Sequence, residues 1–128
     1  MVLAQIGPEG VISFFDYGQY IAVQGTGCWS PEYLDAHFAD LAGLLGRRRR
    51  DRQVLVLVDL TRAGVQSDET AERIRYWTAN LYRQSDRVAI VLASSMLKAQ
   101  MRRYVMVADR ELFLSRTAAL AWLLAKPA

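Results

Sequence analysis

The chain has 128 residues, 52% of them hydrophobic, and carries a formal net charge of +3. This composition excludes a disordered chain, and the single cysteine excludes a small fold held together by disulfides. No apolar run reaches the roughly 18 residues of a membrane-spanning helix, and the first residues lack a secretion signal, so we expect one cytoplasmic domain over residues 1–128 without a transmembrane segment.

Much of the positive charge is concentrated near the middle of the chain. Arg47–Arg50 stand together and Arg52 follows, whereas the remaining charges nearly balance. No aromatic residues are interleaved with these arginines, and positive charge is favoured at the end of a helix. We therefore interpret the cluster as a solvated helix terminus and expect no nucleic-acid partner.

The first predicted element is a β-hairpin. Val11–Phe15 and Tyr20–Gln24 are rich in β-branched and aromatic residues, and Asp16–Gln19 supplies the Asp and Gly that short turns favour. Gly25–Gly27 is expected to end the second strand.

A helix follows the hairpin. Ser30 is placed to cap it, and Pro31 suits its first position, where no backbone donor is lost. Gly46 and the arginines after it are expected to end the helix. The predicted buried stripe consists of Leu34, Phe38, Leu41, Leu44 and Leu45.

Two five-residue runs are apolar without alternation. Val54–Val58 and Val88–Leu92 therefore predict strands that are buried on both faces. The first is followed by an expected loop, Asp59–Gln66, and a further short strand is expected at Leu112–Leu114.

Polar caps precede the three remaining predicted helices. Ser67 or Asp68 caps the second helix, Ser94 or Ser95 caps the third, and Ser115 caps the last. We summarise the order as ββαβαβα and predict an α/β fold, with a mixed sheet that starts with a hairpin and continues through right-handed crossovers.

Three segments resemble the SpoIIAA-like group of the STAS superfamily. They are the strand end Val58–Thr61, the strand Asp86–Val91, and a closing pattern that begins at Phe113 and continues through Ala118–Leu123. The likeness spans most of the chain. It implies a STAS-like sheet with helices packed on it, no cofactor, and a non-enzymatic regulatory domain. The alternative, found among other relatives, is a domain that binds a small apolar or anionic ligand.

The founding members of this group antagonise anti-sigma factors and are switched by phosphorylation of a serine after the central strand. The corresponding junction here reads Gln66-Ser67-Asp68-Glu69, with the aspartate–serine order reversed and no glycine. Ser67 is then a candidate phospho-acceptor in a shifted register, or Asp68 holds a fixed negative charge in its place. The simpler interpretation is that Ser67 and Asp68 only cap the helix.

A second candidate site lies where the parallel strands end, because ligands of open α/β sheets bind beyond those ends. Thr61, Arg62, Ser94 and Ser95 offer hydroxyls and one guanidinium to an anion there. The alternative is two ordinary capped helices.

No residue pattern predicts catalysis or a metal site. His37 is the only histidine and has no identifiable acid or nucleophile partner, and Cys28 is interpreted as a lone buried thiol. One histidine and one cysteine do not complete a zinc site, and Asp59 lacks the further carboxylates of a phosphotransfer site. We therefore expect no catalytic residue, no metal and no enzyme.

The second helix carries a candidate partner surface, Arg73, Tyr76 and Trp77, because arginines and aromatic residues dominate such contacts. A regulatory protein is the expected partner. The last helix, Arg116–Ala125, is apolar nearly all round, which suggests a homodimer. The second functional hypothesis is a small-ligand carrier with an apolar pocket between sheet and helices, and an enzyme that uses Asp59 ranks last.

Overall fold

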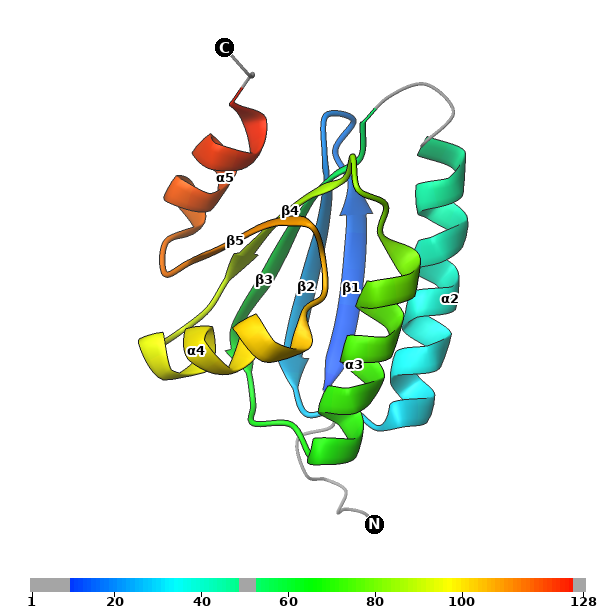
Figure 1. Ribbon diagram of the computed structural model, residues 1–128, viewed down its shortest axis with the longest axis vertical. Helices are drawn as coiled ribbons and strands as arrows, with labels where there is room; N and C mark the ends of the chain where they lie inside the picture. The colour runs from blue at the N-terminus through cyan, green and yellow to red at the C-terminus, as the bar shows by residue number, and fades with distance from the viewer. Residues whose placement is uncertain (1–9, 49–52, 126–128) are drawn as a thin grey trace.

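The computed structural model describes residues 10–48 and 53–125 of the chain. Its strands are β1 (Val11–Asp16), β2 (Ile21–Gly27), β3 (Leu55–Ala63), β4 (Arg87–Val91) and β5 (Asp109–Phe113). Its helices are α2 (Pro31–Arg48), α3 (Asp68–Leu81), α4 (Ser95–Tyr104) and α5 (Arg116–Leu124). Figure 1 shows α2 and α3 running along the strands and α4 running across them.

Within the described residues the strands form one sheet in the order β1-β2-β3-β4-β5. β1 pairs antiparallel with β2, and every other neighbouring pair is parallel. The mixed α/β sheet with an N-terminal hairpin is therefore confirmed. The observed order, ββαβαβαβα, contains the predicted ββαβαβα and continues with β5 and α5, whose segments the sequence predicts individually.

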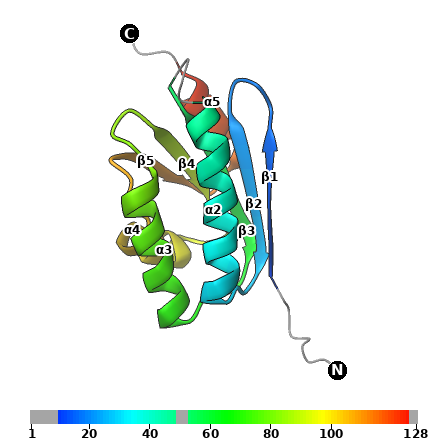
Figure 2. The same ribbon diagram turned by 90° about the vertical axis from the view of Figure 1, so that its right-hand side faces the viewer.

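The central strands are covered on both faces, as their unbroken apolar runs predict. Side chains alternate along a strand, so Val56 and Ile90 join a larger core under α2 and α3, whereas Leu57 and Ala89 join a smaller core under α5. Figure 2 shows α2 and α3 as neighbouring helices of one layer. The larger core therefore lies between that layer and the sheet.

Strands β2 and β3 extend further than the sequence predicts. Gly25–Gly27 continues β2 instead of ending it, and β3 runs on to Ala63 through residues expected in a loop. Thr26 pairs with Arg62 after an irregularity in the β2–β3 register. This extension depends on pairing between distant segments, which local composition does not reveal.

Serine caps occur at the predicted helix starts. The side chains of Ser30, Ser67, Ser94 and Ser115 accept hydrogen bonds from backbone N–H groups three residues later, at 3.1–3.2 Å. Gly46, in contrast, lies inside α2 and does not end it. A single glycine costs a helix only about 1 kcal/mol, so the packed stripe of α2 outweighs it.

The apolar sequence of α5 is explained by the second face of the sheet. Ala119 and Leu123 are buried against that face, and the ring of Trp122 packs near Phe113. The homodimer stays a prediction. No helix among the described residues is long and apolar enough to cross a membrane.

Candidate functional site

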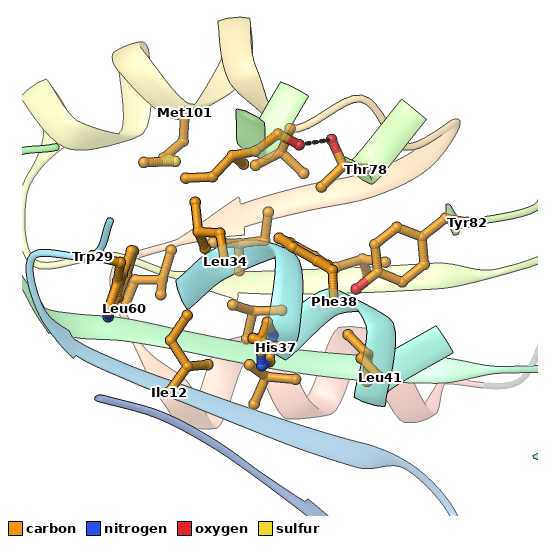
Figure 3. Close-up of a pocket in the computed structure, with 16 residues that line it drawn as sticks. Ile12, Trp29, Leu34, His37, Phe38, Leu41, Leu60, Thr78, Tyr82 and Met101 are labelled. Atoms are coloured by element: carbon orange, nitrogen blue, oxygen red, sulfur yellow. Dashed lines mark hydrogen bonds between the residues drawn. The ribbon is translucent and has the colours of Figure 1, made fainter. Parts of the chain in front are cut away.

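A cavity of about 70 Å³ lies in the larger core, between the sheet and helices α2, α3 and α4. Its wall includes Ile12 from β1, Phe38 from α2, Thr78 from α3 and Met101 from α4, as Figure 3 shows. A core cavity of roughly 150 Å³ is known to hold benzene. The space therefore suits a very small molecule as it stands, and a larger one only if part of the wall moves.

The wall of the cavity is almost entirely hydrocarbon. Its polar side-chain groups belong to Trp29, His37, Thr78 and Tyr82, and no described lining residue carries a charge at neutral pH. The Thr78 hydroxyl is already engaged, because it donates to a carbonyl of its own helix and accepts the N–H of Met106, both at 2.9 Å. A wall of this kind fits an apolar molecule with few polar groups.

His37 points from α2 into the core, and only 8% of its surface is exposed. Its ring meets Phe14 and Phe38 edge-on, with centroids 5.8 and 5.0 Å away, and forms no hydrogen bond with another described residue. Burial lowers the pKa of His37 to about 4, although the charge of Asp40 opposes this shift. The imidazole is therefore neutral at neutral pH.

Trp29 lies on the cavity wall in the turn before α2 and is 7% exposed. Two glycines make room for its indole, since a Cβ at Gly10 would lie 2.5 Å from Cδ1 and one at Gly25 would lie 2.7 Å from Cζ2. The Nε1–H group is buried and has no hydrogen-bond acceptor among the described residues. The Nε1–H of Trp29 is thus a buried polar group of this wall without a partner among the described residues.

Helix α4 covers the cavity with little buried surface of its own. None of its residues is buried, whereas α2 buries five. It contributes Met101 to the wall, and methionine is the most adaptable of the apolar side chains. A change of the Met101 rotamer would break no hydrogen bond of that side chain.

The fold of this protein, rather than its sequence, is what resembles known proteins. No protein-family model and no curated protein matches the chain. Among solved structures it is similar to an uncharacterised protein of Shewanella loihica PV-4, described as a DUF3478 family protein with a SpoIIAA-like fold. The TM-score is 0.61 over 91% of this chain and 94% of the other, at 18% sequence identity. This protein has a SpoIIAA-like fold. The likeness supports the predicted relationship, and at this identity it concerns the fold alone.

In this SpoIIAA-like fold, Ser67 is the N-cap of α3. Its hydroxyl accepts the backbone N–H of Thr70 at 3.1 Å, so the capping role is confirmed. Ser67 and Asp68 are both exposed. Phosphorylation of Ser67 and a switch role for Asp68 stay predictions.

The residues of the predicted anion site are partly engaged in contacts of the protein itself. The Thr61 hydroxyl donates to Asp59 at 2.7 Å, and the Ser94 hydroxyl caps α4. Arg62 and Ser95 are exposed. An anion would compete with these internal hydrogen bonds, and the site stays a prediction.

Asp59, on which the enzyme hypothesis depends, is held in a structural contact. Its carboxylate accepts hydrogen bonds from Thr61 and pairs at 3.0 Å with Arg116, in the first turn of α5. Burial raises the pKa of Asp59, but the hydrogen bonds from Thr61 and Arg116 outweigh it and leave the pKa lowered. The contact ties β3 to α5, which favours a structural role.

The three residues of the predicted partner surface lie together. Arg73, Tyr76 and Trp77 line an open groove between α2 and α3, beside Asp35. The Trp77 indole N–H donates to Asp35 at 2.7 Å, and its ring stacks on Phe38 with centroids 5.6 Å apart. Arg73 also pairs with Asp35, and hydrogen bonds from Trp77 and Arg73 lower the pKa of that carboxyl. Tyr76 is 60% exposed and does not bind Asp35. Of the three side chains it is therefore the most accessible to a partner.

The interpretation of the arginine cluster as a solvated helix terminus is wrong for Arg48. The guanidinium of Arg48 pairs with Asp16 and donates to the carbonyl of Gly18, so it fastens the hairpin turn to the end of α2. Gly18 has a φ of 85°, a conformation that favours glycine. Arg49–Arg50 and Arg52 lie outside the described residues.

Two more side chains, Cys28 and His37, differ in their burial from what the sequence predicts. Cys28 is exposed rather than buried, and its thiol donates to the carbonyl of Val65 at 3.3 Å. The buried stripe predicted for α2 omits His37, which is buried because it follows Leu34 by three residues and so shares its buried face. That spacing is the signal in the sequence for a polar group inside the core.

Proposed function

We propose that this protein is a non-catalytic binding domain that holds a small apolar molecule between its sheet and helices α2, α3 and α4. The observation that carries the proposal is the hydrocarbon-lined cavity, whose wall includes Met101 of α4. Apolar cavities of this kind stay dry and take up apolar molecules, because water finds too few partners in them. The SpoIIAA-like fold is compatible with this role but does not by itself favour it.

The test uses toluene as the probe and two substitutions in α4. Met101→Phe adds volume to the cavity wall, and we expect it to weaken toluene binding by about tenfold or more, as a misfit of one or two groups does in an apolar pocket. Met96→Phe is the matched control, because Met96 is 75% exposed and does not line the cavity. Isothermal titration calorimetry measures both affinities. Equal loss in the two variants would contradict the proposal.

A second candidate function is contact with a regulatory protein through the groove that contains Arg73, Tyr76 and Trp77. Trp77→Ala is a poor test, because Trp77 also binds Asp35. Tyr76→Ala removes an exposed ring and should abolish capture of a partner by the purified protein from its own host. Arg75→Ala, at an exposed position of the same helix, should not. Undiminished capture by Tyr76→Ala would exclude this surface.

A further inference from the structure

The larger core contains two polar side chains that form no side-chain hydrogen bond with another described residue. His37 and Trp29 line the same cavity, and each is more than nine-tenths buried. The Trp29 Nε1–H is fully buried and has no hydrogen-bond acceptor among the described residues, and the His37 ring forms no hydrogen bond with any of them. Buried polar groups are satisfied in the great majority of cases, and each exception requires an explanation.

The chemistry of these two groups restricts what would satisfy them. A neutral imidazole has one donor and one acceptor nitrogen, and an indole has one donor only. A hydroxyl both donates and accepts, so it can pair with either nitrogen of His37 or accept from Trp29. A charged group would enter a wall in which no described residue carries a countercharge, and burial of an unpaired charge is costly.

We propose that the cavity selects an uncharged molecule with an apolar body and one hydroxyl group, which hydrogen-bonds to His37, over a hydrocarbon or an acid of the same shape. The aromatic side chains of the wall, which include Trp29, His37, Phe38 and Tyr82, suit a flat body. This inference rests on the proposed binding function. It adds the chemical class of the ligand.

The test is a thermodynamic cycle with phenol, toluene and benzoate as probes. Phenol and toluene differ by a hydroxyl in place of a methyl, so the ratio of their affinities isolates that group. We expect the ratio to shift against phenol by about 2- to 10-fold in His37→Phe, the worth of one hydrogen bond. We expect no binding of benzoate to either protein.

Three outcomes separate the inference from the function on which it rests. An unchanged phenol-to-toluene ratio in His37→Phe overturns the inference and leaves the binding function intact, as would be found if ordered water satisfied His37. Tight binding of benzoate also overturns it. Failure of both toluene and phenol to bind wild-type protein overturns the proposed function itself.

A second measurement covers the case in which His37→Phe does not fold. The imidazole ¹⁵N resonances of His37 in wild-type protein report hydrogen bonding directly. Phenol should shift them and toluene should shift them far less. Equal shifts with the two probes would contradict a hydrogen bond from the hydroxyl.

Discussion

At the scale of single residues, the buried histidine has the clearest thermodynamic consequence. His37 is neutral in the folded protein because burial lowers its pKa to about 4, whereas an unfolded chain restores a pKa near 6.5. Between these values the unfolded chain binds a proton that the folded protein does not. His37 therefore links the stability of the folded protein to pH.

We expect the free energy of unfolding to fall as the pH is lowered from about 6.5 to about 4, by on the order of 3 kcal/mol in total. Above this window the His37 contribution is constant. Asp35 and Asp59, whose pKa values are lowered, lose their contributions only below the ordinary carboxyl range near pH 4. Urea unfolding at a series of pH values measures the slope. His37→Phe should flatten it, and the same slope in both proteins would exclude His37 as its source.

At the scale of elements, local signals in the sequence predict where the helices begin, and pairing at a distance decides where the strands end. Ser67 and Ser94 cap their helices as predicted, because a cap depends on residues only three positions apart. The extension of β3 to Ala63 depends on its partner β2. The sequence does not predict which residues line the cavity, because its wall joins residues as far apart in the chain as Ile12 and Val105.

Helix α5 illustrates a contact between elements that carries a prediction of its own. Arg87 in β4 donates from Nη1 to the carbonyl of Trp122 at 3.2 Å, lies 3.9 Å from the centre of the Trp122 ring, and pairs with Asp109 at 3.0 Å. It therefore binds the carbonyl end of α5, where positive charge is favoured.

We expect Arg87→Met to lower the free energy of unfolding by about 2 kcal/mol, because it removes charge-assisted hydrogen bonds from a mostly buried guanidinium. Arg62→Met is the control, at an exposed position, with an expected effect below about 0.5 kcal/mol. Urea denaturation measures both. If the two variants lost equal stability, the role of Arg87 at the end of α5 would be refuted.

At the scale of the whole molecule, one sheet separates two cores with different properties. The core under α5 is small and formed by Leu57, Ala89, Val91, Ala119 and Leu123. The core under α2 and α3 is larger and contains the cavity and the unpartnered Nε1–H of Trp29, and the lightly buried helix α4 covers it. The sequence predicts that both faces are covered. It does not predict which face is packed less completely, because packing density depends on how side chains from all elements fit together.

The central claim, that the larger core binds a small apolar molecule, is tested most directly by methyl-detected NMR during a toluene titration. We predict saturable shifts of the methyl groups that line the cavity, those of Leu34, Val88 and Met101. The Leu123 methyls, in the core under α5, should not move. Unchanged spectra, or shifts as large at Leu123 as at the cavity, would contradict the account.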